Sequence, residues 1–266
     1  MNLENGVVAQ SNGLSSGQLI HAVVTGAGSG AGADIAVALA QAGYAVTVIG
    51  RTQSTLMTTC ARHARIAFQV ADVSDELALS SALDAASAAF GPVAIAVANA
   101  GVSHSARLED TTATMLQHTM DVNFRGTFNL WQATVPGMKR QGFGRLIAIC
   151  STAGLKGYGY VSAYVAAKHA VIGLTRALSI ELATSGVTAN AVCPGFMDTP
   201  MLQASIDNIV ATTGRSAEQA AQALRAFNPQ RTFVAPAAVA SAVCWLASTA
   251  ASHVNGHALA LSGGEI

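Results

Sequence analysis

Short apolar runs alternate with longer helical segments along most of this 266-residue chain. The runs are continuous and contain few polar residues, which is typical of strands that are buried on both faces of a parallel sheet. Seven strands are expected, at residues 19–24, 45–49, 66–70, 93–98, 145–149, 187–192 and 257–261. Helical spacing predicts helices at residues 33–41, 75–90, 114–140 and 163–184, with Pro136 as a candidate break in the third.

This order of elements predicts an α/β fold with a doubly wound arrangement. Helices that connect parallel strands by right-handed crossovers cover both faces of one sheet. We therefore expect a single Rossmann-type domain over residues 19–266, with a parallel seven-stranded sheet and helices on both faces. Residues 1–18 are polar and rich in Gly, Ser and Asn, and we expect them to form a flexible N-terminal arm.

The stretch at about residues 199–230 interrupts the alternation of strands and helices. It predicts two short helices, at residues 201–212 and 216–227, that are joined through Gly214. The stretch follows a strand end, which is where open α/β sheets bind their ligands. We predict a small helical lid over the substrate, and an ordinary packing excursion is the alternative.

Composition and charge narrow the class of protein. Hydrophobic residues make up 51% of the chain and charged residues 11%, which favours a large core and buried subunit interfaces. The formal net charge is zero, so a nucleic-acid partner is not expected. No run of about eighteen apolar residues predicts a membrane span, and residues 1–18 lack the apolar centre of a signal peptide.

The cysteines and histidines suggest a reduced protein without a metal ion. Cys60, Cys150, Cys193 and Cys244 are far apart and include no Cys-x-x-Cys pair, which is typical of a cytoplasmic chain with free thiols. The seven histidines are scattered as well. We therefore expect a cytoplasmic protein and no metal site.

A glycine-rich turn follows the first predicted strand and opens the first predicted helix. Its sequence is Thr25-Gly26-Ala27-Gly28-Ser29-Gly30-Ala31-Gly32. Glycine lets the backbone approach a pyrophosphate closely, and the amino end of a helix favours anions. In this strand–turn–helix context the pattern predicts a dinucleotide site, with a merely flexible turn as the alternative. The expected contacts are Gly26, Gly28, Ser29, Gly30, Ala31 and Gly32.

The end of the second predicted strand bears on the choice of cofactor. NAD sites usually carry an acidic residue here, which binds the ribose hydroxyls. This chain has Gly50 followed by Arg51, whose planar guanidinium can pair with a 2′-phosphate. NADP(H) is therefore favoured, and NAD(H) is the alternative because Arg51 is also compatible with a solvated surface position.

Ser151 and the Tyr164–Lys168 pair form the clearest catalytic pattern in the chain. The i,i+4 spacing places Tyr164 and Lys168 on one face of a helix. An ammonium beside a phenol favours the phenolate, so such a tyrosine can take up or release a proton near neutral pH. With Ser151 as a hydrogen-bond donor to a carbonyl oxygen, the pattern predicts ketone/alcohol chemistry.

Taken together, the motifs resemble those of the short-chain dehydrogenase/reductase family, over nearly all of residues 19–264. They stand in the family's order: Thr25-Gly26-x-x-x-Gly30-x-Gly32, Asp72-Val73, Asn99-Ala100-Gly101, Asn123, Ser151, Tyr164-x-x-x-Lys168, and Pro194-Gly195 followed by Thr199. The resemblance implies an NAD(P)-dependent oxidoreductase that interconverts a secondary alcohol and a ketone. One departure is Ser262, which precedes Gly263-Gly264 where many members carry Asp.

The resemblance also implies a role for each catalytic motif. Tyr164 would be the general acid/base, and Lys168 would hold the nicotinamide ribose and favour the phenolate. Ser151 would polarise the substrate carbonyl, and Asn123 would fix a water in the proton relay. Each residue singly also fits a structural role, such as a turn serine or a solvated lysine, but the combination favours catalysis.

Further motifs of the family would hold the cofactor. The implied contacts are Asp72 and Val73 at the adenine, Asn99, Ala100 and Gly101 along the cofactor, and Pro194, Gly195 and Thr199 at the carboxamide.

The substrate is less constrained by the sequence. Proximity to the motifs predicts a pocket wall of Ser103, His104, Ala153, Tyr158, Tyr160, Phe196 and Met197. Residues 151–169 are similar to the corresponding region of 3-hydroxybutyrate dehydrogenases, but Ala153 and Val161 stand where those enzymes carry polar carboxylate binders. The expected substrate is therefore a hydrophobic ketone or a 3-oxoacyl/3-hydroxyacyl thioester. Four basic residues could meet a carrier's phosphates, although solvated surface positions are favoured: Arg107, Lys156, Arg215 and Arg225.

Two other classes of function stay open at this stage. One is a catalytically silent nucleotide-sensing or regulatory protein on the same fold, and the other is a structural subunit of a larger assembly. The aligned Asn/Ser/Tyr/Lys set speaks against both, because a silent protein needs no proton relay. Members of the family are commonly tetramers, so we expect a homotetramer.

Overall fold

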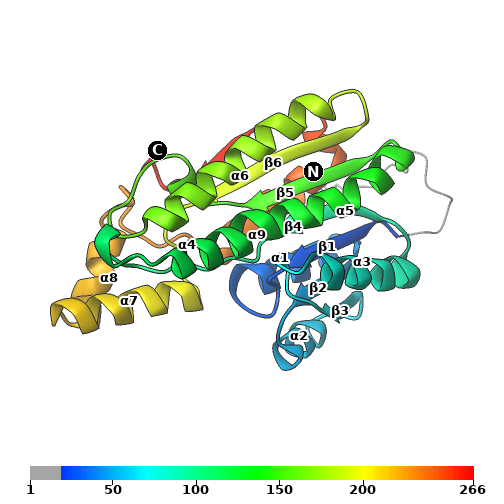
Figure 1. The fold of residues 1–266 in the computed structure, drawn as a ribbon. Helices are drawn as coiled ribbons and strands as arrows, with labels where there is room; N and C mark the ends of the chain where they lie inside the picture. Colours follow the sequence, from blue (N-terminus) through cyan, green and yellow to red (C-terminus); the bar gives the residue numbers. More distant parts are fainter. Residues whose placement is uncertain (1–18) are drawn as a thin grey trace, which may run out of the picture.

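One parallel sheet organises the protein. The computed structural model describes residues 19–266, and the predicted arm at residues 1–18 lies outside the described residues. Seven parallel strands pair in the order β3-β2-β1-β4-β5-β6-β7 (Figure 1). They are β1 (His21–Thr25), β2 (Ala45–Gly50), β3 (Ile66–Val70), β4 (Val93–Ala98), β5 (Gly144–Ile149), β6 (Val187–Pro194) and β7 (Ala258–Leu261). The predicted parallel seven-stranded sheet is confirmed.

The strand order reverses between β1 and β4. From β1 the chain adds β2 and β3 on one side, and from β4 it adds β5, β6 and β7 on the other. The loops that leave the carboxyl ends of β1 and β4 therefore turn to opposite sides of the sheet. Such a switch point is where open α/β sheets bind their ligands.

Helices cover both faces of the sheet (Figure 1). On one face, α1 (Gly30–Gln41) packs against α9 (Pro236–Ala247). On the other face lie α3 (Glu76–Phe90), α5 (Gly126–Gln141) and α6 (Ser162–Glu181), with α4 (Ala113–Met120) beside α6. The shorter α2 (Gln53–Cys60) packs against β2 and β3. This arrangement is the predicted doubly wound fold.

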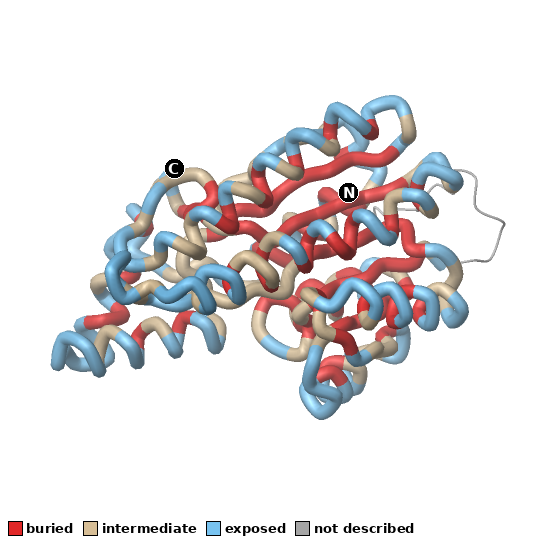
Figure 2. Tube along the Cα trace, in the orientation of Figure 1, coloured by how far each residue is buried: buried red, intermediate tan, exposed pale blue. Residues whose placement is uncertain are grey.

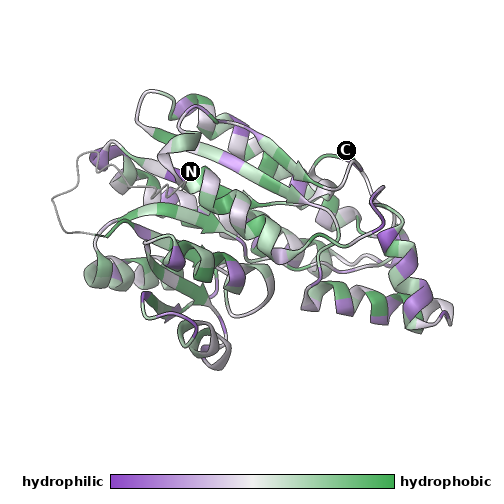
Figure 3. Ribbon diagram, turned by 180° about the vertical axis from the view of Figure 1, so that it is seen from behind, coloured by the Kyte–Doolittle hydropathy of each residue, from purple (hydrophilic) through white to green (hydrophobic). Residues whose placement is uncertain are grey.

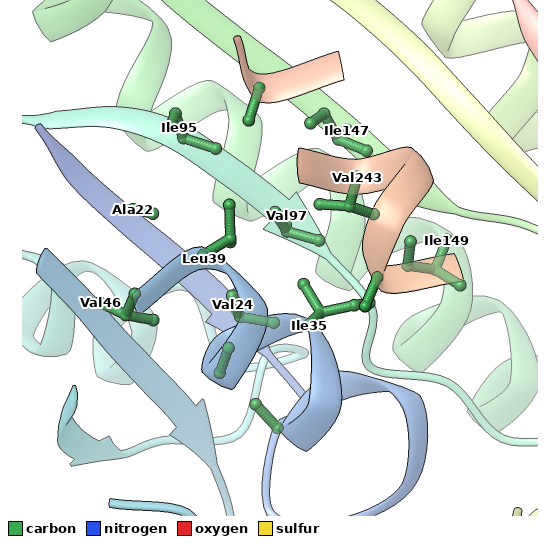
Figure 4. Packing of buried hydrophobic residues seen from close by; sticks show 14 of the residues in the cluster. Ala22, Val24, Ile35, Leu39, Val46, Ile95, Val97, Ile147, Ile149 and Val243 are labelled. Atoms are coloured by element: carbon green, nitrogen blue, oxygen red, sulfur yellow. The ribbon is translucent and has the colours of Figure 1, made fainter. Parts of the chain in front are cut away.

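The two faces of each strand contribute to different cores. In β1, Val24 faces the core beneath α1 and α9, which includes Ile35 and Val243 (Figure 4). Its neighbour Val23 faces the opposite core, with Leu130 of α5. Successive strand side chains point to opposite faces, so both must be apolar when both faces are covered. Figure 2 shows the buried residues concentrated on the strands, with exposed residues on the outer sides of the helices.

The predicted lid projects beyond the carboxyl ends of the strands, at the left of Figure 1. It consists of α7 (Pro200–Thr213) and α8 (Ala217–Arg225), with Gly214 between them at φ +68°. Leu202, Ile206 and Leu224 form a small core of their own between the two helices. The hydropathy colouring in Figure 3 shows green apolar turns along α7 and purple polar turns along α8.

The helix expected at residues 114–140 is interrupted, but not at Pro136. A π-helical turn, Asp121–Arg125, separates α4 from α5. Pro136 lies within α5 on its exposed side, and the helix continues through it. Proline removes the amide that would bond to the carbonyl of Gln132, and that residue is exposed, so water can satisfy the carbonyl.

The sequence patterns did not predict helices α2 and α9. α9 packs beside α1 on the sheet, and its residues are apolar or small on the exposed side as well as the buried side, so it has no polar face to give a 3.6-residue period. α2 is short and mostly exposed, with only Leu56 and Thr59 buried. Among residues 19–266, no helix has both the length and the apolar character needed to cross a bilayer.

Candidate active site

A cavity of about 340 Å³ lies at the carboxyl ends of the strands, at the switch point. Its walls come from the turn after β1, the ends of β2 and β3, the loop after β4, the π-turn and α6. The structure therefore brings together segments that are far apart in the sequence. The predicted site residues in its lining are Gly26, Ser29, Gly30, Ala31, Gly32, Arg51, Asp72, Val73, Asn99, Ala100, Gly101, Asn123, Tyr164, Lys168, Met197 and Thr199.

The glycine-rich turn packs directly against the loop after β4. Gly26 has φ +64°, and a Cβ atom there would lie 2.6 Å from the Cα atom of Ala100. A Cβ atom on Gly32 would lie 2.6 Å from the carbonyl oxygen of Gly26. The side-chain amide of Asn99 donates hydrogen bonds to the carbonyl oxygens of Thr25 (3.0 Å) and Gly26 (3.1 Å). Glycine is required at both positions, and Asn99 fixes the shape of the turn.

The start of α1 has the character of an anion site. Ser29 precedes the helix, and its side chain caps no amide within the described part of the chain. The first amides of a helix have no acceptor inside the helix, and here they belong to residues that line the cavity. Free amides and the positive end of the helix dipole both favour a negative group. The residues present therefore fit the pyrophosphate of a dinucleotide.

Arg51 and Asp72 face each other at the ends of β2 and β3. The Nη1 atom of Arg51 lies 3.9 Å from Oδ2 of Asp72, and the two side chains are 64% and 37% exposed. Burial raises the pKa of Asp72, but hydrogen bonds from Ser74 and the charge of Arg51 outweigh it and hold the pKa below its ordinary value. The carboxylate is therefore charged, and the loosely held guanidinium remains accessible to a second anion.

The π-turn determines the orientation of Asn123. The side-chain amide of this buried residue donates hydrogen bonds to the carbonyl oxygens of Val102 (2.8 Å) and Thr119 (2.9 Å). Both amide protons are thereby used, and Oδ1 is buried without a partner among the residues that the structure describes. A Cβ atom on Gly101 would lie 2.8 Å from this oxygen and 3.7 Å from Nζ of Lys168. Gly101 thus keeps open a space between an acceptor and a donor, where a bridging water fits.

Lys168 is buried beside Tyr164, as their spacing predicted. Lys168 is 4% exposed, and its Nζ atom donates a hydrogen bond to the carbonyl oxygen of Ile149 (3.0 Å). The same atom lies 5.6 Å from the centroid of the Tyr164 ring. No carboxylate in residues 19–266 forms an ion pair with it. A buried charge without a counterion is costly, so this ammonium is suited to stabilise negative charge that forms in the site.

Ser151 directly follows the cavity residues Ile149 and Cys150 at the end of β5. Its Oγ atom accepts a hydrogen bond from the backbone amide of Ala153 (3.1 Å) in the 3-10 turn Thr152–Gly154. This contact orients the side chain but leaves the hydroxyl proton free. The serine can therefore donate a hydrogen bond to a carbonyl oxygen at this end of the site.

Several predicted contacts lie outside the lining of the described cavity. Met197 alone of the predicted pocket wall belongs to that lining. Ala153 is buried, while His104 and Tyr160 are exposed, and Tyr160 has φ +67°. The predicted residues outside the lining are Gly28, Pro194, Gly195, Ser103, His104, Ala153, Tyr158, Tyr160 and Phe196, with Ser151 at its edge.

The structure adds residues that the motifs did not reveal. Val102, Val122 and Met201 contribute apolar surface to the cavity. Val102 and Val122 each neighbour a predicted residue in the sequence, and Met201 lies two residues after Thr199, which was the available signal. Glu265 lies near no predicted site residue in the sequence, so no such signal was available for it. Its carboxylate is 3% exposed and lies 2.7 Å from Nζ of Lys156, which is therefore not the solvated surface lysine that was expected.

Comparisons with known proteins identify the family of the chain. Residues 20–210 match the short chain dehydrogenase family. D-beta-hydroxybutyrate dehydrogenase of Cupriavidus necator is 34% identical over 250 residues, which cover 92% of this chain and 97% of that protein. The 3-oxoacyl-(acyl-carrier-protein) reductase MabA of Mycobacterium bovis is 36% identical over 193 residues, 73% of this chain and 74% of that protein. A crystal structure of an actinorhodin polyketide ketoreductase with NADPH superposes with a TM-score of 0.90 at 32% identity, covering 93% of this chain and 97% of that one.

Proposed function

The chain belongs to the short-chain dehydrogenase family, and on this basis we propose how its site works and what it acts on. It is an NAD(P)-dependent oxidoreductase that interconverts a hydroxyl group and a ketone. The observation that carries the proposal is the convergence of Asn123, Tyr164 and Lys168 on one wall of a cavity whose other wall is the glycine-rich turn. One wall suits proton transfer, and the other suits a dinucleotide.

The cofactor contacts follow from this arrangement. The turn glycines and the first amides of α1 would hold the pyrophosphate, and Asp72 and Val73 would border the adenine. Pro194, Gly195 and Thr199 would meet the carboxamide. When bound, the nicotinamide supplies or accepts the hydride, and the protein positions it and controls the charge around it.

The proton chemistry belongs to the chain's own side chains. During reduction, Tyr164 would give its phenolic proton to the carbonyl oxygen, while Ser151 donates a hydrogen bond to the same oxygen. The ammonium of Lys168 would stabilise the phenolate that remains. A water held between Asn123 Oδ1 and Lys168 would then return a proton to Tyr164, and oxidation would run these steps in reverse.

The first experiment follows consumption of NADPH and NADH in parallel. Its substrates are acetoacetate, acetophenone, α-tetralone and acetoacetyl-coenzyme A. Replacing Tyr164 with Phe should lower kcat about 10²- to 10⁴-fold while the Kd for the reduced cofactor, measured by fluorescence, stays unchanged. Tyr44→Phe is a matched control, because Tyr44 precedes β2 at the opposite end of the sheet. A Tyr164→Phe variant with unchanged turnover would contradict the assignment.

We favour NADP(H) over NAD(H) as the cofactor. Support comes from Arg51, which is solvent-accessible and only loosely held by Asp72, and from Gly50, which stands where an acidic residue would repel a 2′-phosphate. The similar actinorhodin ketoreductase was solved with NADPH. A higher kcat/KM with NADPH than with NADH would support the preference, and the reverse order would refute it.

The substrate that best suits the site is a hydrophobic ketone or a 3-oxoacyl thioester. Val102, Met197 and Met201 line it with apolar side chains. Ala153 offers no polar group, and Lys156, a candidate for binding a carrier's phosphates, is already paired with Glu265. A higher kcat/KM for acetophenone, α-tetralone or acetoacetyl-coenzyme A than for acetoacetate would support this, whereas a preference for acetoacetate would overturn it.

We also propose a cytoplasmic homotetramer. Support for the assembly comes from large apolar side chains that are exposed on several helices, among them Leu116 on α4, Phe128 on α5, Ile180 on α6 and Trp245 on α9. Association of subunits would remove these side chains from water. A monomeric mass in small-angle scattering would refute the assembly.

A further inference from the structure

A buried carboxylate lies beside the proposed substrate end of the site but outside the motifs of the family. Glu265 follows β7 and two glycines with positive φ, Gly263 (+61°) and Gly264 (+94°), which turn the chain inward. Its Oε1 atom lies 2.7 Å from Nζ of Lys156 and 2.5 Å from the hydroxyl oxygen of Tyr158. Thr152 Oγ1 lies 2.6 Å from the same hydroxyl. We call these four residues the Glu265 cluster.

The direction of each hydrogen bond in the Glu265 cluster follows from the carboxylate. An ionised carboxylate only accepts hydrogen bonds, so Tyr158 must donate its proton to Glu265. The phenol oxygen can then only accept, so Thr152 donates to Tyr158. Burial raises the pKa of Tyr158, and the neighbouring Glu265 raises it further, so the phenol stays protonated. The chain of bonds from Thr152 to Glu265 therefore has one fixed polarity.

Aromatic contacts extend the Glu265 cluster to two further segments. The ring of Tyr158 lies 6.2 Å from that of Phe196 and 5.6 Å from that of Phe227, centroid to centroid. Nζ of Lys156 lies 5.0 Å from the Tyr158 ring and 5.8 Å from the Phe227 ring. Phe196 precedes the cavity residue Met197, and Phe227 follows the lid helix α8. The cluster thus joins the loop after Ser151, the segment after β6 and the base of the lid.

The geometry of the carboxylate suggests more than a stabilising contact. Oε2 of Glu265 is buried and has no partner among residues 19–266, and it faces Gly195, where a Cβ atom would lie 3.4 Å away. A buried charge that keeps one oxygen unsatisfied is a poor source of stability, and well-packed apolar residues would do as well. Polar networks of this kind fix one arrangement of the groups that they hold.

We propose that Glu265 is a positioning residue for Ser151. Its carboxylate holds Tyr158 and Lys156, Tyr158 holds Thr152, and Thr152 directly follows Ser151 at the end of β5. The inference rests on the proposed role of Ser151 as donor to the substrate carbonyl. Loss of Glu265 would release the loop, so that the serine hydroxyl meets the carbonyl less often in the productive geometry.

Three variants separate positioning from simple stabilisation. Glu265→Ala removes both contacts and should lower kcat about 10- to 100-fold, with an unchanged Kd for NADPH. Glu265→Gln keeps an oxygen that accepts the hydrogen bond from Tyr158, but it replaces the charge partner of the Lys156 ammonium with a neutral amide. The decrease in kcat should therefore be smaller than in Glu265→Ala. Adding Lys156→Met to Glu265→Gln removes that conflict and should bring kcat back to within about threefold of wild type. The substrate is whichever of acetophenone and acetoacetyl-coenzyme A the wild type reduces faster.

A matched control and a second measurement keep the test independent of folding. Glu181→Gln is the control, because Glu181 is an exposed acid at the carboxyl end of α6, the end of that helix far from Tyr164. It should leave kcat unchanged. Amide hydrogen exchange across residues 151–161 should be faster in Glu265→Ala than in wild type, while the strands keep their protection. If Glu265→Ala keeps wild-type kcat and wild-type exchange in this loop, the positioning role is wrong.

Failure of this inference can be told apart from failure of the proposed function. If Tyr164→Phe loses turnover but the Glu265 variants do not, the catalytic assignment stands and the positioning role falls. If kcat is equally low in Glu265→Gln and in the double variant Glu265→Gln with Lys156→Met, and if the free energy of unfolding falls in parallel with kcat, Glu265 only supports the fold. If no substrate is reduced, the exchange measurement alone decides, and unchanged exchange in Glu265→Ala overturns the inference.

Discussion

Two lysine–tyrosine pairs follow β5, and their surroundings give them opposite properties. Lys168 is buried 5.6 Å from the ring of Tyr164 and has no ion-pair partner in the part of the chain that the structure describes. Lys156 lies 5.0 Å from the ring of Tyr158, and Glu265 neutralises its charge. The carboxylate of Glu265, present beside one pair and not the other, therefore accounts for the difference between them.

The difference shows that residue types alone do not set the chemistry of such a pair. Beside Lys168, negative charge on a phenol oxygen is favoured by an ammonium that no carboxylate of residues 19–266 pairs with. Beside Glu265, burial and the carboxylate raise the pKa of Tyr158, which stays a neutral hydrogen-bond donor. The first environment suits proton transfer, and the second suits holding a loop in place.

The sharpest test removes each ammonium in turn. Lys168→Met should lower kcat/KM about 100-fold or more, because the phenolate loses its stabilising charge and the cofactor ribose loses a donor. Lys156→Met should lower it less than about tenfold, because the hydrogen bond from Tyr158 to Glu265 remains. Steady-state kinetics on purified variants would show the difference. Similar losses in both variants would mean that the two lysines do not differ as the structure suggests.

Arg51 offers an intermediate case, since its carboxylate partner is distant and exposed. At 3.9 Å and 64% side-chain exposure, the pair with Asp72 leaves the guanidinium accessible to a 2′-phosphate. Arg51→Ala should raise KM for NADPH about tenfold and leave KM for NADH nearly unchanged. Arg62→Ala is the matched control, because Arg62 pairs closely with Asp34 at 2.8 Å. Equal changes for both cofactors would place Arg51 outside the 2′-phosphate contact.

The sequence predicted the catalytic pair and not the Glu265 cluster, for a physical reason. Tyr164 and Lys168 meet through helical spacing, which is local and readable. Glu265 meets Lys156 and Tyr158 only because β7 pairs with β6 and the glycines after it turn the chain inward. Contacts of that kind depend on the whole sheet order and leave no periodic signal.

The same contrast holds for the fold. The five inner strands, β1, β2, β4, β5 and β6, were predictable because both of their faces are buried, which gives continuous apolar runs. Helix α9 was missed because even its exposed side consists mostly of apolar residues, such as Ala237, Ala238 and Trp245, so it has no polar face. The interruption of the long predicted helix occurs at Asp121–Arg125, where the turn aims Asn123 into the site, and not at Pro136, where the exposed side tolerates a missing amide.

The smallest expected effect concerns stability at alkaline pH. The pKa of Tyr158 is raised in the folded protein, so the unfolded chain loses this phenolic proton first, at about pH 10. The contribution of Tyr158 to stability is therefore complete below about pH 10 and decreases as the pH rises above it. One proton limits the slope to about 1.4 kcal/mol per pH unit, and partial exposure of the ring reduces it further. Denaturant unfolding at pH 8 to 11 should show a steeper loss of stability in wild type than in Tyr158→Phe. Parallel curves would indicate that Glu265 does not hold this phenol in its protonated form, and the contrast between the two tyrosines would then lose its electrostatic basis.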